Sequence, residues 1–260
     1  MKKTLIALAL AATAVSGSAM AWTPNGLGGT MEFGGTLTPK DVVNPWEVQV
    51  GPNMDALNGS LKPYERVVNI TLSKAVPLLG IRVADASKEF AGAPGIAPQI
   101  DYKNAVNVDG FAAGETTLTL KVVKASDAAA ELGTLIAKLS AASVVSSSTN
   151  LDKRTLIALN AGDGFFGGLP KTSAGAPASE HAAWTMLRAL SSEYTAKYIG
   201  GAELTDIATG STRFANPLIK YSAAYGAGLK SGSTVTINLT SPATADMAWK
   251  ANFPITVSYN

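Results

Sequence analysis

The chain has 260 residues, no cysteine and one histidine, and its 21 basic and 19 acidic residues leave a formal net charge of +2. The absence of cysteine excludes a disulfide framework, an iron–sulfur cluster and a thiolate zinc site. The charge argues against nucleic acid or an anionic lipid surface as a partner, because there is no excess of positive charge to bind phosphates.

The first 21 residues have the three parts of a secretory signal peptide. Two lysines precede an apolar run at 5–15, and Ala19 and Ala21 occupy the small-residue positions before a cleavage site. The apolar run is too short to span a membrane. We therefore predict a signal peptide at 1–21 and an exported chain that begins at Trp22. This chain is formally neutral, because both lysines leave with the signal.

Residues 26–39, GLGGTMEFGGTLTP, alternate between an apolar or bare face and a polar face. The first face comprises Leu27, Gly29, Met31, Phe33, Gly35 and Leu37. Because a strand points alternate side chains to opposite faces, this stretch is predicted to be an amphipathic strand. Its glycines lose backbone entropy on ordering and pack nothing, so we expect it to be ordered only in the groove of another molecule.

Further strands are predicted wherever apolar and polar residues alternate. They are expected at 46–50, 67–73, 78–83, around 100–102, and at 116–124, 134–141, 218–225, 234–240, 247–249 and 253–259. The pair at 116–124 and 134–141 is expected to form a hairpin, and 141–150 is interpreted as a surface connection. Residues 51–62, which contain Gly-Pro and Asn-Gly, are predicted to form turns. Many short strands separated by turn residues indicate a β-sandwich.

The closing strand has the same period as the opening one. Its alternate side chains are Phe253, Ile255, Val257 and Tyr259, with polar residues or proline between them. The chain thus begins and ends with an alternating strand, and the last one carries a tyrosine in the penultimate position.

One amphipathic helix is predicted after Ser179. Its apolar face is expected to comprise Ala183, Leu187, Leu190, Tyr194 and Tyr198. Gly200 supplies the stop. This helix makes the central part of the chain a partly helical insertion in an otherwise all-β sequence.

Residues 162–167 fit the pattern G-x-G-x-x-G, yet Gly168 and Pro170 follow at once. A dinucleotide site needs a helix that opens at the last glycine, so nucleotide binding is rejected. We predict instead a loop, long and rich in glycine, that exposes Phe165 and Phe166. Exposed aromatic rings beside polar groups suit carbohydrate, so these two residues are candidate receptor contacts.

The sequence offers no catalytic constellation. His181 is the sole histidine, it lies in the first turn of the predicted helix, and no G-x-S-x-G motif accompanies it. One histidine without cysteine gives no zinc-binding spacing. We expect no metal, no cofactor and no enzymatic activity.

The chain resembles the major subunits of fimbriae assembled by the chaperone–usher pathway, in the enterotoxigenic branch whose major subunit is also the adhesin. The matching segments are MKKTLIALA, the run at 29–37, Trp46-Glu47, ELGTL at 131–135, residues 222–226 with SGSTV at 231–235, and the ending 249–259. The resemblance is strong at both ends and weak between about 141 and 216.

The resemblance implies an immunoglobulin-like sandwich that lacks its last strand, with a groove beside the C-terminal strand. A periplasmic chaperone fills the groove, and at the outer-membrane usher the N-terminal extension of the next, identical subunit replaces it. Residues 22–40 would be that donor strand, with Leu27, Met31, Phe33 and Leu37 as groove-filling side chains and Gly29 or Gly35 where the groove narrows.

The same resemblance assigns the remaining parts. Residues 41–260 would form the pilin domain, with an adhesive insertion at about 141–216 that contacts a host glycoconjugate. Phe253, Ile255, Val257 and Tyr259 would form the groove edge and the chaperone contact. The protein would pass through the periplasm to a cell-surface fimbrium.

Three alternatives stay open. A non-adhesive or minor fimbrial subunit would share both end strands and bind no receptor. A small outer-membrane β-barrel is disfavoured by the low aromatic content of 7%, the central helix and the polar terminal Asn260. A secreted glycan-active enzyme would need a pair of acids that the sequence does not offer.

Overall fold

The computed structural model describes residues 33–36, 43–54, 57–147, 152–200 and 209–260. The chain divides after Lys40, and every described helix and strand lies in the second unit, Asp41–Asn260. In these ranges no helix is long and apolar enough to cross a membrane. The predicted signal peptide and most of the predicted donor strand lie outside the described residues.

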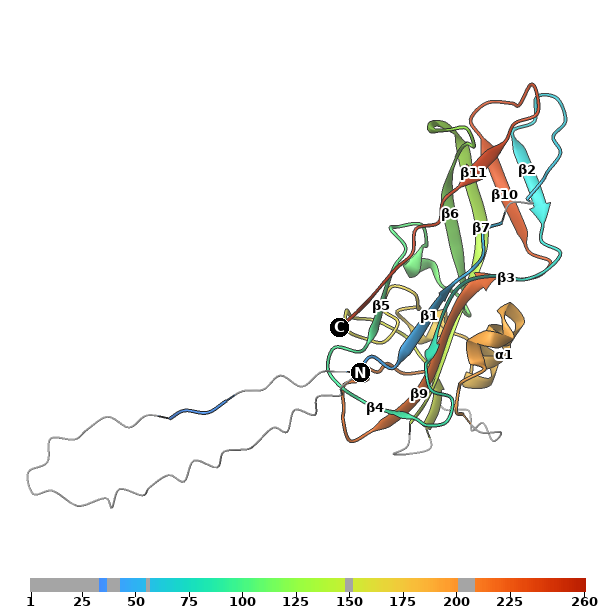
Figure 1. Cartoon of the computed structure of the whole chain (residues 1–260). Helices are drawn as coiled ribbons and strands as arrows, with labels where there is room; N and C mark the ends of the chain where they lie inside the picture. The colour runs from blue at the N-terminus through green and yellow to red at the C-terminus, as the bar shows by residue number, and fades with distance from the viewer. Residues whose placement is uncertain (1–32, 37–42, 55–56, 148–151, 201–208) are drawn as a thin grey trace, which may run out of the picture. The chain divides into compact units, whose positions relative to one another are not determined.

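The unit is all-β with one α-helix among the described residues, as predicted (Figure 1). The strands are β1 (Trp46–Val50), β2 (Val67–Thr71), β3 (Val76–Val83), β4 (Phe90–Ala91), β5 (Pro98–Asp101), β6 (Glu115–Lys124), β7 (Asp127–Ser147), β8 (Asp152–Thr155), β9 (Lys220–Leu229), β10 (Thr234–Leu239), β11 (Trp249–Ala251) and β12 (Thr256–Tyr259). The helices are α1 (Glu180–Leu190) and the 3-10 turns η1 (Val108–Gly110), η2 (Ser173–Gly175) and η3 (Ser192–Thr195).

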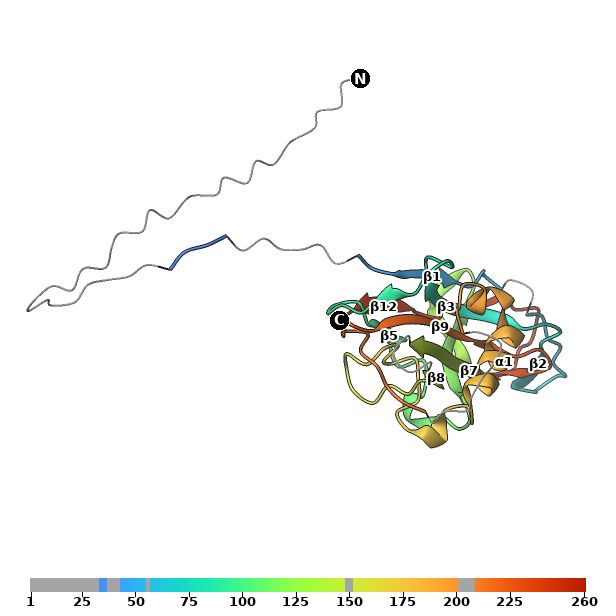
Figure 2. The ribbon, with the colours of Figure 1, turned by 90° about the horizontal axis from the view of Figure 1, so that it is seen from below.

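The 21-residue strand β7 organises the fold. Its first half pairs with β6 and β10, and its second half pairs with β9 and β8. The first half therefore belongs to a sheet in the order β11-β6-β7-β10-β2, and the second half continues through β9 to β3 and β1. β5 and β12 form a separate two-stranded ladder near the C-terminus (Figure 2). The result is an open sandwich, which fits an immunoglobulin-like fold.

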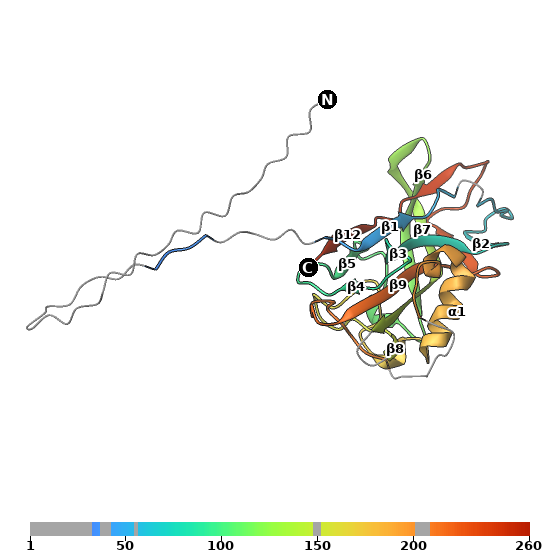
Figure 3. The same ribbon diagram turned by 60° about the horizontal axis from the view of Figure 1, so that its bottom comes forward.

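The second half of β7 corrects the expectation of a surface connection at 141–150. Residues 141–146 are buried on both faces, because α1 covers one face and the main core covers the other (Figure 3). Alanine and serine are small enough to fit between the two layers. The serines make the segment polar in sequence, which is why it was expected at the surface. Residues 148–150 lie outside the described part.

α1 is shorter than predicted. It starts at the Ser179 cap, whose hydroxyl accepts a hydrogen bond from the Ala182 N–H at 3.1 Å, and it ends at Leu190. The extended backbone of Ser191 then starts η3, which carries Tyr194. Tyr194 nevertheless packs with Leu187, as the apolar face predicted, because Gly80 and Gly226 leave room for its ring.

Candidate functional site

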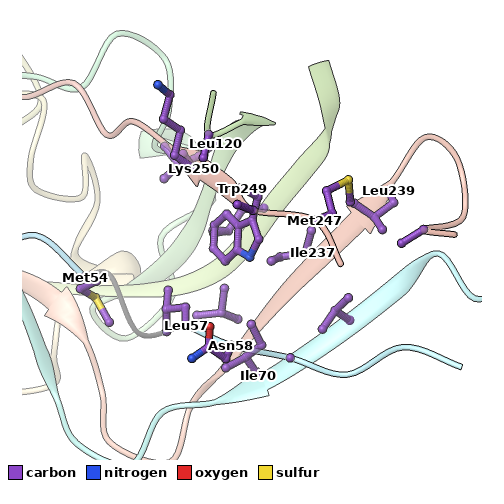
Figure 4. A pocket seen from close by; sticks show the side chains of 18 of the residues that line it. Met54, Leu57, Asn58, Ile70, Leu120, Ile237, Leu239, Met247, Trp249 and Lys250 are labelled. Atoms are coloured by element: carbon purple, nitrogen blue, oxygen red, sulfur yellow. The ribbon is translucent and has the colours of Figure 1, made fainter. Parts of the chain in front are cut away.

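An open groove of about 1440 Å³ lies on the inner face of the sheet that runs from β11 to β2 (Figure 4). Strand alternation creates its floor: Val235, Ile237 and Leu239 of β10 point inward, and the polar residues between them point outward. The rest of the floor is apolar as well and comprises Val68, Ile70, Leu78, Leu118, Leu120, Leu135 and Leu229. Such a groove can take up apolar side chains from another segment.

The chain from Met247 to Ile255 lines one side of the groove, and β12 continues it to Tyr259; residues 247–259 are called the C-terminal wall. Its odd-numbered side chains from Met247 to Val257 are half-buried and pack against the core, and the even-numbered ones are exposed. β11 pairs with β6, and β12 pairs with β5. Within the described residues no strand pairs with the other edge of either, so backbone N–H and C=O groups are free to bond a further strand.

Phe253 and Ile255 line the groove between these two ladders. The Phe253 ring stacks on Tyr102, with centroids 5.1 Å apart and planes inclined by 21°. The Tyr102 hydroxyl is 2.7 Å from that of Tyr225, which also donates a hydrogen bond to the Gly168 carbonyl at 3.1 Å. Burial raises the pKa of both tyrosines above its usual value, so both hydroxyls stay neutral. This buried network fixes the position of Phe253.

The opposite rim consists of β2 and the segment that precedes it. Leu57 and Leu61 pack against the core, and Figure 4 shows Leu57 and Asn58 beside Ile70. A Cβ on Gly59 would lie 2.4 Å from Val68 Cγ1, so only glycine lets the backbone approach β2 this closely. The prediction of turns at 51–62 does not include this contact. The four-residue spacing of Leu57 and Leu61 is the one sequence feature that points to it.

β1 also exposes apolar side chains. Trp46 is buried, whereas Val48 and Val50, at alternate positions after it, are 41% and 60% exposed. β1 pairs only with β3 among the described strands. The unit therefore has apolar side chains and open strand edges at β1, β2 and the C-terminal wall.

The sequence matches the family of major and minor fimbrial subunits over residues 1–260. The chain belongs to this fimbrial subunit family. It is 30% identical to the K88 fimbrial protein AC of Escherichia coli and 28% identical to the F41 fimbrial protein of the same species, and each alignment covers all of both chains. It is also 35% identical to the E. coli K88 fimbrial protein AD over 113 residues, 40% of this chain and 39% of that protein. Fimbrial subunits are components of cell-surface fimbriae, which agrees with the family that the sequence resembles.

The predicted donor residues of this fimbrial subunit are only partly within the described structure. Phe33 is 88% exposed, and no atom lies within 4 Å of a Cβ placed on Gly35. The other four, Leu27, Gly29, Met31 and Leu37, lie outside the described residues. Of the predicted edge residues, Val257 and Tyr259 lie in β12 opposite Ile100 and Pro98.

The expectation that residues 162–167 expose two phenylalanines is wrong for Phe165. Its side chain is fully buried and packs against Trp46, Phe214 and Tyr225. Phe166 is half-buried. As predicted, no helix starts in this loop. The aromatic cluster holds Phe165 in the core, so Phe165 cannot contact a receptor while the subunit is folded.

His181, the sole histidine, lies on α1. It lies on the exposed side of α1, stacked on Trp184 with ring centroids 6.1 Å apart, and the Arg188 guanidinium lies 4.7 Å from the Trp184 ring centroid. Across the described part of the chain, no group of three His, Cys, Asp or Glu side chains is placed to hold a metal ion.

Proposed function

We propose that this fimbrial subunit polymerises by donor-strand exchange, with residues 22–40 of one subunit filling the groove of its neighbour. The observation that carries the proposal is the apolar groove whose C-terminal wall has an unpaired edge. A strand added there bonds through its backbone and inserts alternate side chains into the groove. The apolar face of residues 26–39 supplies side chains with that period.

The free energy of burying the donor side chains favours a stable contact between subunits. Burial of Leu27, Met31, Phe33 and Leu37 contributes about 1.5–3 kcal/mol each, or roughly 6–12 kcal/mol before the entropy of ordering is subtracted. An empty groove is also an aggregation hazard, because it combines apolar surface with open strand edges. A periplasmic chaperone that lends a strand until the usher exchanges it for the next subunit removes this hazard. The proposed role is thus a structural one, as the fimbrial subunit family implies.

Deletion of residues 22–37 tests the exchange. The truncated subunit keeps its groove and is expected to accumulate in complex with the chaperone but to form no filaments. A matched control is Thr36→Ala, which alters the polar face of the donor and should leave assembly unchanged. Filaments of normal length and number from the deletion, seen by electron microscopy, would refute donor-strand exchange through this segment.

Attachment to a host glycoconjugate is the second part of the proposal. It is supported by the half-buried Trp184 ring on α1, which lies between the exposed side chains of His181 and Arg188 within the insertion at about 141–216, since sugars pack on aromatic rings beside polar groups. Purified fimbriae should agglutinate erythrocytes and bind members of a glycan array. Trp184→Ala and Phe166→Ala fimbriae, first shown to assemble normally, identify which ring contributes. Fimbriae that bind no cell and no glycan would support the non-adhesive alternative.

A further inference from the structure

The side chains along the C-terminal wall of the groove differ strongly in size. Within 247–259 the odd-numbered row contains three aromatic side chains, Trp249, Phe253 and Tyr259, and one small residue, Ala251. Tyr259 continues the alternation and is 37% exposed. A strand that pairs with this wall meets a bulky ring at three positions and a gap at one.

Phe253 cannot move aside for an incoming side chain. Its ring is stacked on Tyr102, and Tyr102 is in turn held by the hydrogen bond to Tyr225. Cores resist added volume because their side chains are already close-packed. A donor residue opposite Phe253 must therefore be small, whereas Ala251 leaves space for a large one.

The donor stretch has the matching spacing. Gly29 and Gly35 are six residues apart on the apolar face, and so are Phe253 and Tyr259. Trp249 is four residues from Phe253 and ten from Tyr259, so no other pair of aromatics in this row fits.

We infer that the donor strand, if it is exchanged as proposed above, runs antiparallel to the C-terminal strand with Gly35 opposite Phe253 and Gly29 opposite Tyr259. The glycines then lie under aromatic rings, an arrangement that shields a glycine in a sheet.

The remaining pairs follow from this register. Leu37 lies opposite Ala251 and fills the gap, and Phe33 and Met31 lie opposite the medium-sized Ile255 and Val257. Leu27 lies beyond Asn260 in this register, so it faces no residue of the C-terminal strand. No pair brings two aromatic rings together. The next position on this face of the donor is Pro39, opposite Trp249, and proline ends the ladder because it has no N–H to donate.

Two other alignments are less favourable. A parallel donor also sets both glycines opposite aromatic residues and brings Leu27 to Ala251. Every strand ladder in the described residues is antiparallel, and parallel pairing is slightly less stable per residue. An antiparallel donor shifted by four residues brings Phe33 to Ala251, but it leaves Gly29 opposite Ile255 without an aromatic cover.

One acceptor cysteine distinguishes the three alignments. Ala251→Cys is combined with Leu37→Cys, Phe33→Cys or Leu27→Cys, and each donor position is opposite residue 251 in only one alignment. The chain contains no cysteine, so no background disulfide forms. Residues directly opposite in adjacent antiparallel strands have Cα atoms about 4.5–5.5 Å apart, within disulfide range. Purified L37C/A251C fimbriae should therefore run as a ladder of covalent oligomers on a non-reducing gel, and the other two should run mainly as monomers after denaturation.

Each outcome has a separate meaning. A ladder from the Phe33 or Leu27 variant would overturn this register and leave donor-strand exchange standing. Assembled fimbriae that give no ladder with any of the three pairs would also overturn it. Failure of donor-strand exchange itself is detected differently, by filaments from the 22–37 deletion.

A size-compensation experiment is independent of cysteine chemistry. Gly35→Leu should reduce surface fimbriae at least about tenfold, since the added side chain meets the fixed Phe253 ring. Adding Phe253→Ala should restore assembly, while Ile255→Ala should not. Phe253→Ala alone, measured as chaperone-bound subunit in the periplasm, controls for misfolding. Equal rescue by both alanine variants, or unimpaired assembly of G35L, would contradict the register.

Discussion

At the scale of single residues, Tyr225 joins two parts of the fold through one hydroxyl. It donates a hydrogen bond to the Gly168 carbonyl and accepts one from Tyr102, so its loss leaves a buried donor and a buried acceptor without partners. We expect Tyr225→Phe to reduce stability by about 1–3 kcal/mol and Tyr102→Phe by only about 0.5–1.5 kcal/mol, because the latter leaves the bond to Gly168 intact. Urea unfolding of assembled fimbriae measures both. Equal midpoints for the two variants would contradict the assigned direction of the bonds.

The same pair predicts an alkaline transition. Burial raises the pKa of both tyrosines in the folded state, so the unfolded chain releases these protons first as the pH rises. The stabilising contribution is complete below about pH 10, the pKa of an unperturbed tyrosine, and is lost progressively above it. Unfolding midpoints measured from pH 8 to 12 should fall above pH 10, and the double phenylalanine variant should fall less steeply. The same slope in both proteins would assign the transition to other groups.

At the scale of elements, the start of α1 depends on one side chain. The Ser179 hydroxyl accepts a hydrogen bond from the Ala182 N–H, so Ser179→Ala should destabilise the helix by about 0.5–2 kcal/mol. Hydrogen exchange should accelerate in α1 while the amides of β6 and β10 keep their protection. Thr185→Ala, an exposed change in the middle of the helix, is the matched control and should have little effect. Unchanged exchange in the Ser179 variant would show that packing against β7 alone sets the helix start.

At the scale of the whole molecule, the open groove predicts that one chain can be completed by its own donor strand. In the register inferred above, the donor begins beside Tyr259. Residues 22–39 fused after Asn260 through a short turn, and removed from the N-terminus, can therefore fold back as a hairpin. This variant should be monomeric and should melt at a higher temperature than the chaperone-free subunit with an empty groove. The same fusion with Phe33→Asp and Leu37→Asp should show no gain, because charged side chains would be buried in the floor. An aggregated fusion with an unchanged melting temperature would contradict the hairpin.

Features that depend on local periodicity could be predicted from the amino-acid sequence. Period-two alternation identified the strands that form the groove floor and the C-terminal wall, and the helix period with the Ser179 cap identified the start of α1. The pattern in FPITVSYN predicted that Phe253, Ile255 and Val257 share one face, and the structure places all three against the core. These features were predictable because side-chain direction along a strand or helix is fixed by backbone geometry.

Which of these faces is covered depends on how the elements pack in the folded chain. Phe165 lies in a glycine-rich loop that reads as exposed, yet Trp46 and Phe214, distant in sequence, bury it. Leu57 was assigned to a turn, yet it packs at the groove rim, and 141–147 was read as a connection, yet it forms the buried half of β7. Burial depends on contacts between segments far apart in the chain, which local alternation does not encode. The groove is the clearest case: the sequence predicted two alternating end strands, and the fold shows an apolar wall along one of them with an edge that no described strand pairs.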